Sequence, residues 1–191
     1  MSTEPERVDR RFYVRWVRAT SLGWLLGFGL VIVLAMAWNL VGGGAQFMVG
    51  VGMGAGVGYM QSRMIGEWVD STRPWMWASV VGMGAPFVLW DIGAIVGMNS
   101  LFSLPLCVVL GGLLVGLMQR RLLASRSDRA YRWVPACAAG WALPAGAIAL
   151  GDSVSGGWGG LVSLAAMLMG GAVLGLVTGG ALIWLRPRPV A

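Results

Sequence analysis

The sequence contains no histidine and only two cysteines, and this scarcity removes most metal and nucleophile chemistry. Histidine is the commonest metal ligand and general base of proteins. Cys107 and Cys137 fall on different predicted helices near opposite membrane faces, so we expect neither a disulfide nor a metal site. The sequence also lacks a Ser/His/Asp, Cys/His or paired-carboxylate arrangement and a phosphate-binding glycine loop. We therefore predict no enzyme, no metal and no cofactor.

Charged residues are also scarce, and lysine is absent. Only 12% of the residues are charged, 57% are hydrophobic, and the mean hydropathy is +0.73. Soluble domains carry about 25% charged residues. The net charge of +6 comes from arginines that stand only in connections and at helix ends, which is a topology signal rather than a nucleic-acid-binding patch. The composition therefore predicts an integral membrane protein with no nucleic-acid partner.

Apolar runs of roughly 20 residues are long enough to cross about 30 Å of hydrocarbon. Such runs must be helical, because lipid offers no partner for backbone N–H and C=O groups. The predicted spans are 16–38, 44–62, 75–97, 101–119, 133–151 and 158–184.

The arginines predict how these six spans are oriented. The N-terminal segment, the second and fourth connections and the tail contain arginine, whereas the first, third and fifth connections contain none. The positive-inside rule then places both termini in the cytoplasm of a bacterial cell, with the chain in the inner membrane. Tryptophans predict two interfacial belts. The expected cytoplasmic belt is Trp16, Trp68, Trp75, Trp77, Trp133 and Trp184, and the expected outer belt is Trp38, Trp90 and Trp158.

A repeat with a period near 58 residues joins the spans into three hairpins. The odd spans align on a Trp-x2-Ala-x3-Gly string, and the even spans on Gly-x3-Gly followed by Gln or Thr three residues later. Both patterns put small residues on one helix face, which favours close helix packing in lipid. The predicted packing glycines are Gly23, Gly54, Gly58, Gly82, Gly112, Gly116, Gly140, Gly171 and Gly175.

The predicted fold is therefore an all-α membrane bundle of three like-oriented hairpins with pseudo-three-fold symmetry about the membrane normal. Its domain spans 16–186, with repeats 16–68, 75–127 and 133–186, between a basic segment 1–15 and a tail 187–191. The Gly-x3-Gly-x2-Gln string followed by Arg resembles uncharacterised bacterial polytopic membrane proteins built of glycine-rich hairpins. That resemblance implies a fold and no activity. The third repeat departs from it at Thr178, which replaces the glutamine.

Few polar side chains stand in or near the spans. Asp91 is either a solvated carboxylate at a helix end or a proton or cation site. Gln61, Gln119 and Thr178 stand at equivalent positions, where they either bond between helices or ring a vestibule. Arg63 and Arg121, two residues after the glutamines, either reach lipid phosphates or hold a specific anionic ligand.

The basic segment 1–15 has two interpretations. Its arginines recur on one helical face beside an apolar row, which is typical of an amphipathic helix lying on an anionic leaflet. The alternative is an ordinary basic flank of the first span.

Packing and anchoring signals outnumber polar lining residues, which favours a non-catalytic structural or accessory subunit of a bacterial inner-membrane complex. Its expected partners are the bilayer, anionic lipids at the cytoplasmic face and other membrane subunits. The alternative is a small-solute or ion transporter or channel with a path along the pseudo-three-fold axis, using Asp91 or the Gln/Gln/Thr level.

Overall fold

The computed structural model describes residues 4–40, 45–98, 101–154 and 157–185. Within these ranges, the side chains of residues 4–9 and of residue 157 are not described. These residues form six α-helices, a short 3-10 turn η2 (Ala130–Arg132) and no strand. The helices are α1 (Glu4–Asn39), α2 (Phe47–Ser62), α3 (Arg73–Ile95), α4 (Leu104–Leu123), α5 (Trp133–Ser153) and α6 (Gly157–Leu185). The all-helical fold class predicted from the sequence is confirmed.

Five of the six helices are long and apolar enough to cross a membrane, namely α1, α3, α4, α5 and α6. The remaining helix, α2, has 16 residues and therefore extends only about 24 Å. The sequence predicted a span of full length over 44–62, and the described helix is shorter at its start. Five glycines from Gly50 to Gly58 make α2 narrow, and nine of its 16 residues are buried.

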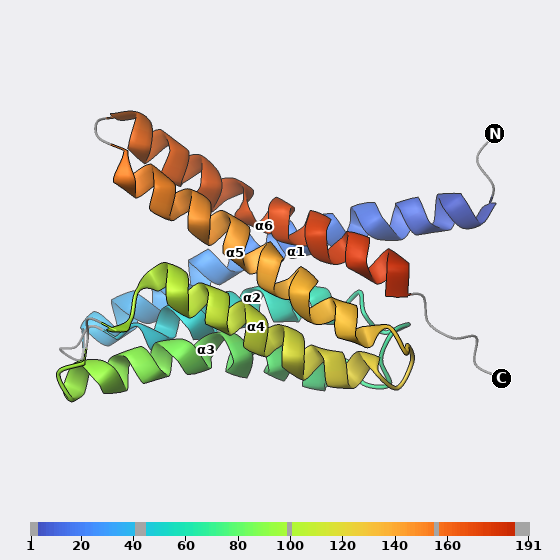
Figure 1. Ribbon diagram of the computed structural model, residues 1–191, viewed down its shortest axis with the longest axis horizontal. Coiled ribbons are helices and arrows are strands. Elements are labelled where there is room, and N and C mark those ends of the chain that lie inside the picture. Colours follow the sequence, from blue (N-terminus) through green and yellow to red (C-terminus); the bar gives the residue numbers. More distant parts are fainter. Residues whose placement is uncertain (1–3, 41–44, 99–100, 155–156, 186–191) are drawn as a thin grey trace.

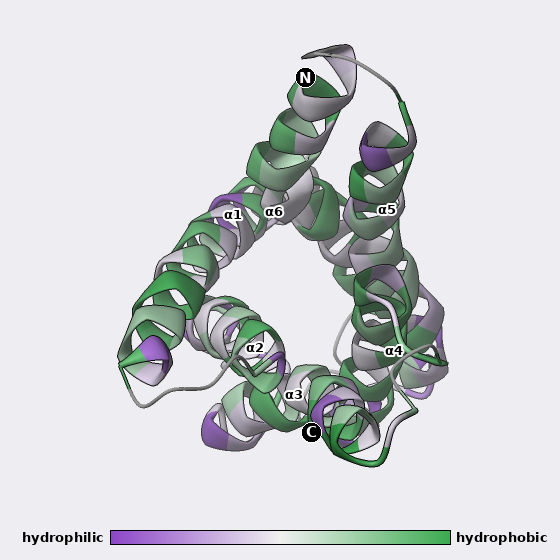
Figure 2. Ribbon diagram, turned by 90° about the vertical axis from the view of Figure 1, so that its left-hand side faces the viewer, coloured by the Kyte–Doolittle hydropathy of each residue, from purple (hydrophilic) through white to green (hydrophobic). Residues whose placement is uncertain are grey.

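The helices are arranged in chain order around a common axis (Figure 2). Each helix packs against the helix before it and the helix after it, and α6 packs against α1, so that the ring closes. Figure 1 shows that the last turns of α1, α3 and α5 and the first turns of α2, α4 and α6 lie at one end of the bundle, which we call the hairpin end. The first described residue of α1, the last of α6 and the connections α2–α3 and α4–α5 lie at the opposite end (Figure 1). We call this the arginine end.

Helix α1 is continuous from Glu4 to Asn39 and extends beyond the bundle at the arginine end (Figure 1). Its 36 residues correspond to about 54 Å, well above the thickness of a bilayer core. Residues 4–15 are thus the first turns of the first long helix and do not form a separate helix. Phe12 packs against Trp68, and the hydroxyl of Tyr13 donates to the carbonyl oxygen of Leu176 at 3.3 Å.

The tryptophan belts predicted from the sequence are wrong in part. Trp16, Trp75 and Trp133 are fully buried and Trp68 is 7% exposed, so these four belong to the protein core. Tryptophans that remain at the surface are Trp38, Trp77, Trp158 and Trp184. A tryptophan near the end of an apolar run is typical of an interface anchor, but Trp16, Trp75 and Trp133 contact one another inside the bundle.

Candidate functional site

The centre of the bundle is closed near the arginine end by three tryptophans, which we call the tryptophan triad. Trp16, Trp75 and Trp133 come from the odd helices α1, α3 and α5. Their ring centroids lie 6.4 Å apart for Trp16–Trp75, 6.3 Å for Trp16–Trp133 and 5.4 Å for Trp75–Trp133. Edge-to-face and tilted contacts at such distances are favourable for aromatic rings. All three rings are fully buried, so they close the axis at this level.

Each ring of the triad donates a hydrogen bond to the preceding even helix of the ring. Trp75 Nε1 donates to Gln61 Oε1 at 3.3 Å, and Trp133 Nε1 donates to Gln119 Oε1 at 3.0 Å. Trp16 Nε1 donates to Thr178 Oγ1 at 3.0 Å, so the same bond joins the first helix to the last. The polar residues predicted to bond between helices or to ring a vestibule thus lie in bonds between helices.

A second set of bonds lies one turn deeper. Gln61 Nε2 donates to Thr20 Oγ1 at 3.3 Å, and Gln119 Nε2 donates to Ser79 Oγ at 2.9 Å. Thr178 instead donates to the carbonyl oxygen of Leu174 in its own helix. No buried side-chain nitrogen or oxygen in the described part of the chain lacks a hydrogen-bond partner. The buried polar side chains of this layer are therefore all engaged in hydrogen bonds within the bundle.

Asp91 lies on α3 at the hairpin end, and its carboxylate caps α2. Oδ1 accepts from the backbone N–H of Gln46 at 2.7 Å, and Oδ2 accepts from that of Phe47 at 2.8 Å. The first N–H groups of a helix have no intrahelical partner, and the helix dipole favours an anion there. Asp91 thus joins the second hairpin to the first. Asp152 lies in the last turn of α5, where it is exposed and accepts from Ser163 Oγ at 2.9 Å.

Between the tryptophan triad and the hairpin end, all six helices enclose a cavity of about 230 Å³, which we call the central cavity. No polar atom contributes to its lining surface. The odd helices supply residues 8 and 12 positions after the triad, so that successive levels are Trp24, Met83 and Trp141, then Phe28, Phe87 and Ala145. Trp24 is held in place because its Nε1 donates to the carbonyl oxygen of Met167 at 2.8 Å.

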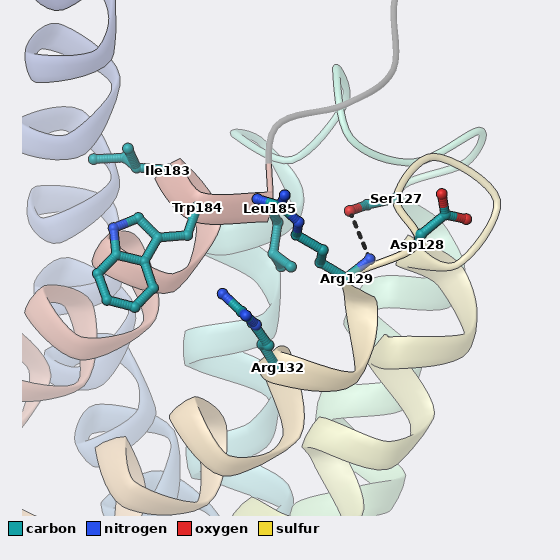
Figure 3. Close-up of a pocket in the computed structure, with 7 residues that line it drawn as sticks. All are labelled: Ser127, Asp128, Arg129, Arg132, Ile183, Trp184 and Leu185. Atoms are coloured by element: carbon teal, nitrogen blue, oxygen red, sulfur yellow. Dashed lines mark hydrogen bonds between the residues drawn. The ribbon is translucent and has the colours of Figure 1, made fainter.

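The arginine end carries open, polar hollows. One of about 580 Å³ lies between η2 and the end of α6, where Arg132 points toward Trp184 and Arg129 extends beside Leu185 (Figure 3). Another, of about 460 Å³, lies on α1 and is lined by Arg10, Arg11, Val14, Arg15 and Arg18. The arginines predicted as anionic-ligand candidates are exposed: Arg63 bonds to and stacks over the ring of Tyr59, and Arg121 points from the last turn of α4.

An ion pair connects the α2–α3 loop with the α4–α5 loop at this end. Arg126 Nη2 lies 2.6 Å from Asp70 Oδ1, and Arg126 Nε donates to the same oxygen at 3.1 Å. Hydrogen bonding and the positive charge of Arg126 lower the pKa of Asp70 below its ordinary value of 3.8. The pair is exposed to solvent and therefore adds little to stability.

The predicted packing glycines lie at contacts between helices. On the odd helices, a Cβ at Gly82 would lie 2.7 Å from the backbone nitrogen of Val115, so this glycine faces the partner helix of its own hairpin. On the even helices, a Cβ at Gly54 would overlap the carbonyl oxygen of Ser79, so this glycine faces the next hairpin. The same division holds for the rest: Gly23 and Gly140 face their own hairpin, and Gly58, Gly112, Gly116, Gly171 and Gly175 face the next one.

Both cysteines are buried free thiols. Cys137 stands four residues after Trp133, where the other two odd helices carry Thr20 and Ser79. Among the described residues, no three Cys, Asp or Glu side chains gather in a way that would hold a metal ion.

Comparison of the chain with family models, with curated proteins and with solved structures finds no match to any of the three. The function proposed below therefore rests on the geometry of this chain alone.

The sequence analysis missed both the tryptophan triad and the central cavity. A signal for them exists: on each odd helix, the residues 4, 8 and 12 positions after the triad tryptophan are buried or line the cavity. Residues four apart share a helix face, so this face, and not the glycine stripe, lines the axis.

Proposed function

We propose that the protein is a non-catalytic structural or accessory subunit of a bacterial inner-membrane complex. The closed tryptophan triad, with every ring nitrogen bonded to the neighbouring helix, carries this proposal. The polar side chains within the bundle serve to hold helices together, which leaves the outer surface as the place where a function can act.

The outer surface offers a face for a partner on α6. The most apolar stretch of α6 is only 22% buried, the lowest value of the five spanning helices. Leu161, Leu164 and Leu168 are each more than half exposed along its hairpin half. Helix association in lipid depends on packing, and a long exposed face with Gly160 open beside it favours close approach of another helix.

Transport along the axis has weaker support. A path would have to pass the triad, where rings of 0% exposure meet. Asp91 and the Gln/Gln/Thr level, the groups on which transport depends, are engaged in a helix cap and in bonds between helices. The central cavity has no polar lining that would replace the hydration shell of a solute.

The finer architecture is part of this proposal. We infer six spans in three hairpins related by rotation about the membrane normal. Support comes from the equivalent bonds of Trp16, Trp75 and Trp133 and from the contact that closes α6 on α1. We place the arginine end in the cytoplasm, because positive residues favour that side, and its arginines at anionic lipid headgroups.

Crosslinking in native membranes tests the proposal. A photoreactive residue is introduced at Leu164 on α6 and, as a matched control, at Leu89 on α3, positions that are 51% and 56% exposed. We expect Leu164 to give one discrete adduct with another membrane protein and Leu89 to give adducts with lipid alone.

A flux assay in liposomes separates the two functions. The purified chain is expected to move neither ions nor small neutral solutes. Adducts with lipid alone at both positions, together with a solute flux that Asp91→Asn abolishes, would refute the structural role and establish transport.

A further inference from the structure

The central cavity exists because one aromatic ring is missing from an otherwise repeated layer. Twelve residues after the triad tryptophans, α1 carries Phe28 and α3 carries Phe87, whereas α5 carries Ala145. All three line the cavity, and Ala145 is 3% exposed. The small side chain therefore leaves space on the α5 side of the axis that a phenylalanine fills on the other two.

Water is a poor occupant of this space. A buried water needs two to four polar partners, and the lining of the central cavity offers none. Of the two indole rings in the cavity wall, that of Trp24 already has its Nε1 bonded to the carbonyl oxygen of Met167. The cavity volume of about 230 Å³ far exceeds what tight packing leaves between helices, so an apolar occupant gains contacts along all six helices.

The shape of the cavity fits a flexible apolar chain. Met53, Met83 and Met167 contribute unbranched side chains that adapt to an irregular partner. The tryptophan triad closes the arginine end. At the hairpin end, the lining includes Leu104, the first residue of α4, which is 37% exposed, and we place the mouth of the cavity there.

We propose that the central cavity binds one hydrocarbon chain of a membrane lipid, inserted from the hairpin end. The lipid headgroup stays outside the mouth, at the bundle end opposite the arginine end. This proposal concerns the interior of the bundle and does not depend on whether a protein partner docks on α6.

Photolabelling with a lipid probe tests the proposal. The full chain is reconstituted in phosphatidylcholine vesicles that contain a phosphatidylcholine with a diazirine near the end of one acyl chain, and the labelled residues are mapped by mass spectrometry. In the wild-type chain we expect labels on Met83, Trp141 and Ala145, which face the cavity, besides labels on the outer surface.

Two variants on α5 supply the comparison. Ala145→Phe restores the missing ring, and Ala139→Phe adds the same ring at an exposed position of the same helix. Ala145→Phe is expected to lower labelling at Met83 and Trp141 about tenfold. If the new ring excludes two methylene groups of the lipid chain from the cavity, the loss of apolar burial weakens binding by about that factor. Ala139→Phe is expected to leave labelling inside the cavity unchanged.

Thermal unfolding of delipidated protein provides a second readout. Filling the cavity should make Ala145→Phe, or the smaller Ala145→Leu if the phenylalanine variant does not fold, less dependent on added lipid than the wild type. Absence of cavity labels in the wild-type chain would overturn the proposal, as would equal labelling of Met83 in wild type and in the folded variant.

Discussion

Replacement of Gln119 by methionine tests whether the hydrogen-bonded layer around the tryptophan triad stabilises the bundle. Gln119 is fully buried, accepts from Trp133 Nε1 at 3.0 Å and donates to Ser79 Oγ at 2.9 Å. Methionine has a similar volume and no comparable hydrogen-bonding group, so Gln119→Met removes both bonds with little change in packing.

The two lost bonds have unequal consequences. Ser79 Oγ still donates to the carbonyl oxygen of Trp75, so this hydroxyl keeps a partner. The ring nitrogen of Trp133 loses its acceptor, and an unsatisfied buried donor costs about 1–3 kcal/mol. Bonds between membrane helices contribute about 0.6 kcal/mol on average and up to about 1.7 kcal/mol. We therefore expect Gln119→Met to lower the free energy of unfolding by about 2 kcal/mol.

A double-mutant cycle with Trp133→Phe isolates the bond from the loss of ring volume. In the double variant neither side chain is left with an unpaired polar atom, so the two effects are expected to be less than additive by about 1 kcal/mol. The assay is reversible unfolding in mixed micelles followed by far-UV circular dichroism, with Leu117→Met on the exposed face of α4 as a control. Strict additivity, or a loss no larger than in Leu117→Met, would show that the buried layer does not hold the helices.

Three further predictions follow from the packing, the cap and the ion pair. Gly56→Ala places a Cβ 2.5 Å from the carbonyl oxygen of Gly23 and should lower the free energy of unfolding by about 1–3 kcal/mol in the same titration. In Gly29→Ala the new Cβ meets nothing within 4 Å, so the higher helix propensity of alanine should raise the free energy of unfolding by up to about 1 kcal/mol. Equal losses of stability in the Gly56→Ala and Gly29→Ala variants would refute close packing of α1 on α2. Asp91→Ala should lower the free energy of unfolding by about 1–2 kcal/mol and speed hydrogen exchange at the Phe47 amide. Asp91→Asn keeps one acceptor oxygen and should have a smaller effect. An unchanged exchange rate at the Phe47 amide would exclude the cap. The Asp70–Arg126 pair contributes to folding stability at neutral pH, and this contribution is lost as the pH falls below 3.8 through the lowered pKa of Asp70. The thermal unfolding temperature of Arg126→Gln should therefore depend less on acid pH than that of the wild type. An identical acid dependence of the two proteins would contradict the pairing.

The sequence predicted the helical class and most helix positions, because long apolar runs have only one regular solution in lipid. The arginine pattern also grouped the correct connections, which lie at one end of the bundle together with the described chain ends. Helix α2 was predicted too long: the apolar run continues upstream of Phe47, and the cap that marks the helix start comes from Asp91, which lies 44 residues later in the chain.

The interior of the bundle was harder to predict. A tryptophan at the start of an apolar run is as typical of a membrane interface as of a buried contact, so the position of Trp16 in the sequence does not reveal which way its ring points. The answer depends on the rotation of each helix about its own axis, which packing sets. Once Gly23 is placed against α2, the ring of Trp16 is turned toward the axis and reaches Thr178. The sequence analysis compared repeats along the glycine faces and therefore did not align Phe28 and Phe87 with Ala145.

The bond between Trp16 and Thr178 links residues 162 positions apart, and this separation has a consequence for biosynthesis. During translation, the first helix leaves the ribosome long before its acceptor on the last helix is made. Until α6 inserts, the nascent bundle is an open arc with a seam along α1, and the Trp16 ring nitrogen has no partner there. The contact of α6 with α1 is therefore the last contact between helices that translation makes possible.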